Sequence, residues 1–191
     1  RFADHPKLGC IGGTILPRFE RPVPAKWNSL LSCLALRDVE APLVTDRFKG
    51  AGALPYGAGM ALRSEVAARY GELVRADPKR RALDRSGGTL TSCGDLDLAC
   101  CAYDCGYQCG LFPELRLTHR IPASRTDPKY LKALAVHIAA SSYLLWKLRG
   151  HHKHPLAKLL IDSFHTLLRG RELRRRLLFL RGSWRAALLG R

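Results

Sequence analysis

The chain has 191 residues, 47% of them hydrophobic and 25% charged, proportions that are ordinary for a globular protein with a buried core. Its formal net charge is +16, and residues 142–191 alone hold 12 Lys and Arg against 2 Asp and Glu. No run approaches the roughly 20 apolar residues that cross a bilayer, so we expect no transmembrane helix.

The sequence opens with an apolar strand, predicted over Leu8–Leu16 and ended by prolines. Gly12 and Gly13 interrupt it, and glycines inside a strand often mark the close approach of another backbone or of a ligand. Residues 24–42 then suggest a weak helix or an irregular stretch.

A second strand-like run ends near Met60–Leu62, and Ser64 is placed to cap the helix that follows, where apolar residues recur at helical spacing. Residues 77–88 are polar and end in two glycines, which predicts a loop. We expect the next helix to run from Asp95 to about Cys105.

Residues 107–122 suggest a pair of strands bent at Pro113, and a helix is predicted from Pro128 to Arg149. Two basic amphipathic segments follow within residues 151–191. In the second of these, one apolar stripe lies opposite a run of arginines. The stripe comprises Leu173, Leu177, Leu180, Trp184 and Ala187.

Five of the seven cysteines fall in the stretch "CGDLDLACCAYDCGYQCG", residues 93–110. Structural zinc sites use two short cysteine pairs separated by a loop, and the irregular spacing here does not match that arrangement. We therefore expect reduced, buried core thiols in a cytosolic protein, with structural zinc as the alternative.

Three polar residues in and after this stretch are candidates for chemistry. Taken alone, Asp95 is best explained as a cap at a helix N-terminus, where a carboxylate suits the helix dipole. Asp97, further into the same helix, reads as a solvated residue, and His119 as a surface histidine at a strand end.

Three segments together nevertheless resemble a known family. They are "HPKLGCIGGTILPRFE", "GAGMALRSEV" and the stretch from Cys93 to Pro122, which ends in "PELRLTHRIP". In this order and spacing they look like the second half of a family 2 glycosyltransferase domain of the GT-A fold, over about residues 3–145. The resemblance implies an α/β fold: the C-terminal portion of a mixed-sheet, three-layer domain over residues 1–150, followed by a helical basic tail over residues 151–191.

The resemblance also implies a reaction, the transfer of a sugar from a nucleotide-sugar to an acceptor hydroxyl with inversion. Asp95 matches the family's general base, which takes the proton of the acceptor hydroxyl. The glutamate that usually precedes this base is Gly94 here, a departure that removes one carboxylate. Asp97 is expected to orient the helix and to contribute to substrate binding.

Further positions follow from the same match. Gly57 and Gly59 would let the backbone approach the donor sugar or the acceptor, and Arg120, like Arg63, could assist with phosphate charge, although solvation explains both arginines. The leaving diphosphate is normally neutralised by Mg²⁺ or Mn²⁺. His119 matches a position that helps to hold this metal or the diphosphate.

The family's nucleotide-binding half, with its metal-binding D-x-D motif, would precede Arg1. We therefore expect the isolated chain to lack most of the donor site, to bind nucleotide-sugar weakly or not at all, and to be inactive alone. We also expect an unpaired sheet edge where strands are missing. A non-catalytic remnant that serves as an interaction module is the main alternative.

The expected partners are a nucleotide-sugar donor and a saccharide or lipid-linked acceptor. The basic tail favours peripheral contact with an anionic membrane, or else packing on the domain or on a partner. The location expected is cytoplasmic, or peripheral on the inner membrane face. A nucleic-acid-binding protein is a remote alternative, because the aromatic residues are not interleaved with the basic ones.

Overall fold

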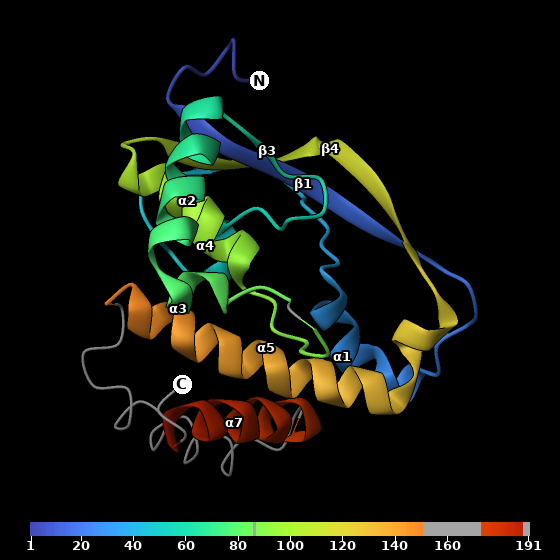
Figure 1. The fold of residues 1–191 in the computed structure, drawn as a ribbon. Coiled ribbons are helices and arrows are strands. Elements are labelled where there is room, and N and C mark those ends of the chain that lie inside the picture. The colour runs from blue at the N-terminus through green and yellow to red at the C-terminus, as the bar shows by residue number, and fades with distance from the viewer. Residues whose placement is uncertain (86, 151–172, 189–191) are drawn as a thin grey trace. The chain divides into compact units, whose positions relative to one another are not determined.

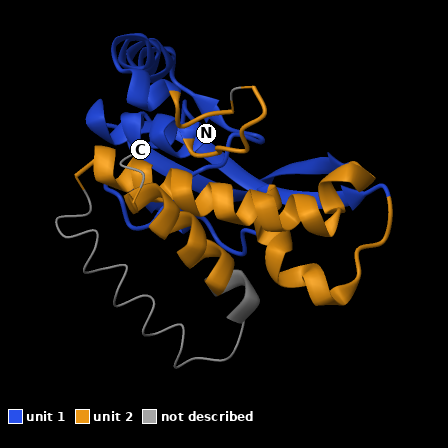
Figure 2. Cartoon of the chain, turned by 60° about the horizontal axis from the view of Figure 1, so that its bottom comes forward, with its two compact units in different colours: residues 1–20, 35–81, 94–121 blue, residues 21–34, 82–93, 122–191 orange. Residues whose placement is uncertain are grey.

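The computed structural model describes residues 1–85, 87–150 and 173–188 (Figure 1). The chain divides into two compact units, shown in different colours in Figure 2. Unit 1 comprises residues 1–20, 35–81 and 94–121, and unit 2 comprises residues 21–34, 82–93 and 122–191. Every candidate site residue lies in unit 1.

Unit 1 is built on a mixed sheet of four strands in the order β2-β4-β1-β3. Their bounds are β2 Leu43–Thr45, β4 Gln108–Ile121, β1 Leu8–Phe19 and β3 Ala61–Leu62. The two long strands, β1 and β4, run parallel, and a short antiparallel strand flanks each of them. The predicted first strand is thereby confirmed, and the mixed α/β class with it.

The strand β4 corrects the predicted strand pair bent at Pro113, because residues 108–121 form one continuous strand. Gly13 of β1 pairs with Phe112, and the next residue of β1 pairs with Arg116, so three residues of β4 bulge out of the ladder. Pro113 lies in this bulge, where a residue without an N–H is tolerated. A Cβ on Gly13 would collide with the bulged backbone at the carbonyl of Leu115, which explains the glycine inside the strand.

The helices of unit 1 are α2 Ser64–Ala76, α3 Pro78–Arg81 and α4 Gly94–Asp104. The predicted helices over α2 and α4 are confirmed, whereas α3 falls in the segment predicted as a loop. The predicted cap at Ser64 is wrong, because Arg63 occupies the N-cap position and the Ser64 hydroxyl donates to the carboxylate of Glu65. Helix α4 contacts β1, β4 and α2, and so packs on the sheet.

The cysteines behave as predicted for core thiols. None of the seven, all of which lie within the described ranges, forms a disulfide bond, and five are buried: Cys10, Cys93, Cys100, Cys101 and Cys109. Cys10 and Cys109 are register partners on β1 and β4. The hydrogen bond between these two thiols, together with burial, raises the pKa of Cys10, and the same bond lowers the pKa of Cys109.

Unit 2 is helical. Its helices are α1 Asn28–Leu31, between the single turns η1 Ala25–Trp27 and η2 Ser32–Leu34, then α5 Pro128–Leu148 and α7 Leu173–Leu188. Helix α5 confirms the prediction, and Asp127 caps its N-terminus, because the Asp127 carboxylate accepts hydrogen bonds from the amides of Lys129 and Tyr130. The irregular character predicted for residues 24–42 is also confirmed. The first basic tail segment falls on residues 151–172, outside the described residues.

Only some residues of the apolar stripe predicted on α7 pack against α5. Trp184 and Ala187 contact the buried pair Tyr143 and Ala186, on α5 and α7 respectively. Leu177 instead remains 48% exposed. The buried face of α7 includes Gly182, where a Cβ would collide with the carbonyl of Val136, so the absence of a side chain lets the two helices approach closely.

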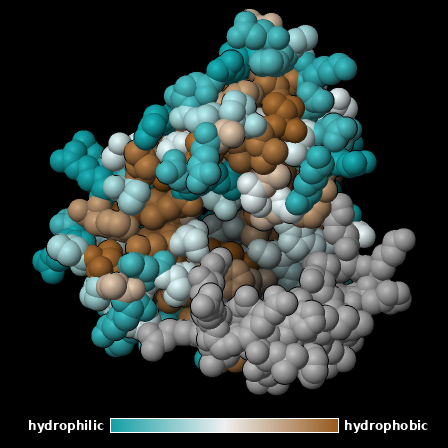
Figure 3. All heavy atoms as spheres, turned by 180° about the vertical axis from the view of Figure 1, so that it is seen from behind, coloured by the Kyte–Doolittle hydropathy of each residue, from teal (hydrophilic) through white to brown (hydrophobic). Residues whose placement is uncertain are grey.

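The surface of the described residues mixes polar and apolar side chains, and apolar patches are visible in the view of Figure 3. The large hydrophobic residues that remain exposed are Leu16, Leu43, Val44, Leu177 and Leu188. Each helix of the described ranges is too short or too polar to traverse a lipid bilayer.

Candidate functional site

Asp95 lies in the first turn of α4, where its side chain is partly buried. The Tyr70 hydroxyl, from α2, donates to the carbonyl of Gly94 over 3.0 Å and so fixes the start of this helix. The Asp95 carboxylate accepts two amide hydrogen bonds, from Leu96 at 2.9 Å and from Gly57 at 2.8 Å. The helix N-terminus and both amides favour a negative charge at this position.

The turn around Gly57 and Gly59 lies against the start of α4. A Cβ on Gly57 would stand 3.2 Å from the Cβ of Asp95, so this backbone passes close to the carboxylate. Gly59 has a φ of +75°, a conformation that favours glycine, and a Cβ there would collide with the side chain of Leu117 on β4. The turn therefore contacts both the helix start and the sheet.

His119 and Arg120 lie further along β4 and on opposite faces. Alternate residues of a strand share a face, so His119 is on the same face as Leu117, which contacts the turn. His119 is partly buried, and its Nδ1 atom is fully buried. It is therefore not the surface histidine that the sequence alone suggested. Arg120 is exposed on the other face. The structure thus joins Asp95 directly to Gly57, places Gly59 in the same turn against Leu117, and places His119 on the adjoining strand face.

Asp97 is fully buried, which excludes the solvated reading. Both of its carboxylate oxygens accept from one guanidinium nitrogen of Arg80, at 2.8 and 2.7 Å. The side chains are 0% exposed for Asp97 and 16% for Arg80. This contact ties α4 to α3. Sequence reasoning missed Arg80 because 17 residues separate it from its partner.

Arg63 is also not the solvated surface residue that the sequence suggested. Its guanidinium group donates to the backbone carbonyls of Leu8, Phe2 and Pro6, and it lies over the ring of Tyr107 at 5.5 Å. These contacts hold the N-terminal segment against the start of β1. Arg63 is therefore occupied in stabilising unit 1.

No group of three or more His, Cys, Asp or Glu side chains suited to a metal is found within residues 1–85, 87–150 and 173–188. Mg²⁺ requires near-octahedral oxygen coordination, and Mn²⁺ also favours oxygen ligands, whereas His119 offers a single imidazole. The described residues therefore do not by themselves form a binding site for the predicted Mg²⁺ or Mn²⁺. They also offer no set of ligands for the alternative, a structural zinc ion.

The arrangement can do one kind of chemistry plainly. A carboxylate that is fixed by two amides, partly open to solvent and bordered by a glycine turn can accept a proton from a bound hydroxyl. In comparisons with known proteins, no family model, no curated protein and no solved structure matches the chain.

Proposed function

We propose that the chain carries the acceptor side of an inverting glycosyltransferase site, with Asp95 as the general base. The single observation that carries this proposal is the Asp95 carboxylate, held by the amides of Leu96 and Gly57 at the mouth of a glycine turn. The resemblance of the same segments to family 2 glycosyltransferases supports it, because the base of that family occupies the matching position.

The chemistry follows from the geometry of the carboxylate. An acceptor hydroxyl is a poor nucleophile until its proton is removed, and a positioned carboxylate contributes roughly 10²–10⁴-fold to such a step. The two amides fix the orientation of the Asp95 side chain, so no free energy is lost in ordering it when the acceptor binds. As the acceptor oxygen attacks the anomeric carbon, Asp95 takes its proton and the nucleoside diphosphate leaves from the opposite face.

The neighbouring residues have supporting roles in this proposal. Because Gly57 and Gly59 lack side chains, the turn carries only the methyl group of Ala58, which would let a sugar approach the backbone. His119 would face the diphosphate, and Arg120 would act only on a ligand that reaches the other face of β4. Asp97, bonded to Arg80, orients the helix that carries Asp95. The dependence on Mg²⁺ or Mn²⁺ remains a prediction.

The acceptor is proposed to be a saccharide or a lipid-linked sugar, at a cytoplasmic location or on the inner membrane face. The second candidate function is a non-catalytic interaction module. One observation favours it: the bonds of Asp95 connect the 57–59 turn to α4, which is also what a purely structural carboxylate would do. Activity of an Asp95 variant separates the two.

The test uses the protein expressed from the complete reading frame that contains this chain, assayed for release of nucleoside diphosphate from a panel of nucleotide-sugars. Asp95→Asn keeps the side chain's shape and one of its two acceptor atoms but removes the base. Asp104→Asn, at the exposed end of the same helix, is the matched control. The proposal predicts loss of turnover in the first variant and wild-type turnover in the second; equal turnover in both favours the interaction module.

A further inference from the structure

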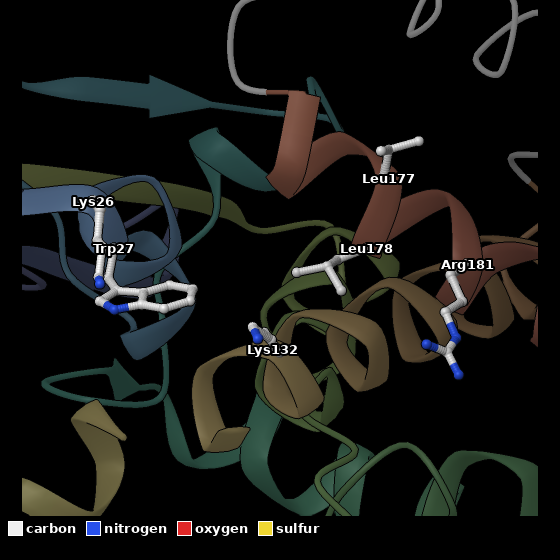
Figure 4. Close-up of a pocket in the computed structure, with 6 residues that line it drawn as sticks. All are labelled: Lys26, Trp27, Lys132, Leu177, Leu178 and Arg181. Atoms are coloured by element: carbon white, nitrogen blue, oxygen red, sulfur yellow. The ribbon is translucent and has the colours of Figure 1, made fainter. Parts of the chain in front are cut away.

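Unit 2 contains a pocket of about 490 Å³ that the proposed transfer chemistry does not use (Figure 4). Its walls come from η1, α5 and α7, and its volume falls in the range of small-molecule sites. The residues that line it are Lys26, Trp27, Lys132, Leu177, Leu178 and Arg181. Half of them are cations, and none is acidic.

The positive charge in this pocket has no counter-charge in the described part of the chain. Lys26, Lys132 and Arg181 are exposed, and among the described residues none of them pairs with a carboxylate. Two of them share one aromatic ring: the Nζ of Lys26 lies 6.0 Å and that of Lys132 lies 5.3 Å from the ring centroid of Trp27. Like charges held together in this way are complemented by an anion.

The rest of the wall is apolar. Leu177 is 48% exposed, and Leu178 follows it on the same helix, so hydrocarbon is accessible beside the cations. Trp27 is only 7% exposed, so its ring offers no free face on which a nucleic-acid base could stack. The pocket therefore suits an anion that carries a hydrocarbon chain better than it suits a nucleic acid.

We propose that this pocket binds one molecule of a phosphate-bearing amphiphile. The phosphate would lie between Lys26, Lys132 and Arg181, and the chain would lie along Leu177 and Leu178. The cations supply the charge-assisted contacts and the leucines supply burial of the hydrocarbon. This inference does not rest on the proposed function, because no residue of the Asp95 site lines the pocket.

The test is calorimetric titration of the full chain with decyl phosphate, kept below the concentration at which it forms micelles. We expect saturable binding of one molecule per chain, weakened by added salt because the cations are exposed. Inorganic phosphate has the charge without the hydrocarbon chain, and decyl maltoside has the chain without the charge. Both should therefore bind at least tenfold more weakly than decyl phosphate. Equal binding of either one overturns the proposal.

Substitution of the three cations assigns the site. The combined variant Lys26→Gln, Lys132→Gln and Arg181→Gln should weaken decyl phosphate binding by roughly 10- to 100-fold, since an exposed charge contact is worth roughly two- to fivefold. Leu177→Ser should weaken decyl phosphate but leave inorganic phosphate unchanged. All four side chains are exposed or half-exposed, so circular dichroism should show an unchanged fold.

A control of equal charge change excludes a general electrostatic effect. Lys129 and Lys147 on α5, and Arg185 on α7, are also exposed but do not line the pocket. Neutralising these three to Gln should leave binding within about twofold of wild type. If both triple variants lose binding equally, the positive surface as a whole attracts the anion and the pocket assignment is wrong.

The source of the amphiphile is distinguished by a second arm. Vesicles of phosphatidylcholine, with and without phosphatidic acid, present the same phosphate in a membrane. Co-sedimentation that requires phosphatidic acid and is lost in the pocket variant identifies a membrane lipid as the ligand. Monomer binding without co-sedimentation identifies a free amphiphile, and a lack of both contradicts the proposal.

Discussion

The buried ion pair between Arg80 and Asp97 gives the sharpest stability prediction. Replacing Arg80 by Gln leaves the carboxylate of Asp97 in a fully buried position without its guanidinium partner. Removing one partner of a buried pair costs about 3–5 kcal/mol, because the remaining charge is uncompensated. Since Arg80 itself is 16% exposed and water can reach its end of the pair, we expect the lower end, about 3 kcal/mol.

The asymmetry of the pair sharpens the test. Asp97→Asn removes the buried charge and leaves a partly exposed guanidinium, so it should cost less than Arg80→Gln, about 1–2 kcal/mol. The double variant should then be more stable than the sum of the two single losses predicts, with a coupling of about 2 kcal/mol. Urea unfolding followed by circular dichroism measures all three, and a constant m-value confirms a comparable unfolding transition.

The matched control is the surface pair of Arg69 and Glu72 on α2, whose side chains are 55% and 59% exposed. Arg69→Gln should cost at most about 0.5 kcal/mol. If Arg80→Gln costs no more than this control, the ion pair does not hold α4 in place, and the orienting role assigned to Asp97 is wrong.

Three further predictions concern the sheet and its helices. Gly59→Ala should destabilise the protein by about 1–2 kcal/mol in thermal unfolding, since its φ is +75° and a Cβ would meet Leu117; an unchanged melting temperature would show that the turn is free to move. Burial raises the pKa of Tyr103 above its ordinary value of 10.0, so above pH 10 the unfolded chain loses a proton that the folded protein keeps. Stability should therefore fall by up to about 1.4 kcal/mol per pH unit more in wild type than in Tyr103→Phe, and parallel pH profiles would contradict this. A thiol reagent should quickly label only the two partly exposed cysteines, Cys33 and Cys105, in the native protein, and fast labelling of all seven would show that the core thiols are accessible.

Local sequence patterns were sufficient for the principal elements of the fold. Strand β1, helices α2 and α4, and helix α5 follow from apolar periodicity bounded by Gly and Pro, and each was predicted close to its observed bounds. The continuity of strand β4 was not predicted. In a sequence Pro113 indicates the end of a strand, and only the structure shows the bulge that accommodates it. The three-residue strand β2 carries too short a signal to be recognised.

The contacts of the site could be predicted only in part. Asp95, Gly57 and Gly59 were assigned to one site, and the structure joins Asp95 to the turn that holds both glycines. The hydrogen bond that does so, from the Gly57 amide to Asp95, spans 38 residues and has no local sequence pattern. The partner of Asp97 is hidden for the same reason. Such contacts depend on how helices pack on the sheet, which spacing along the chain does not encode.

The most direct test of the central claim is the turnover of nucleotide-sugar by the protein from the complete reading frame, compared between wild type and Asp95→Asn. If Asp95 is the base, the variant should lose at least about 100-fold in kcat, and the KM for the donor should change by less than about threefold, because the residue acts on the acceptor proton. Retention of more than about a tenth of wild-type kcat would contradict that role and leave Asp95 as the residue that joins the 57–59 turn to α4.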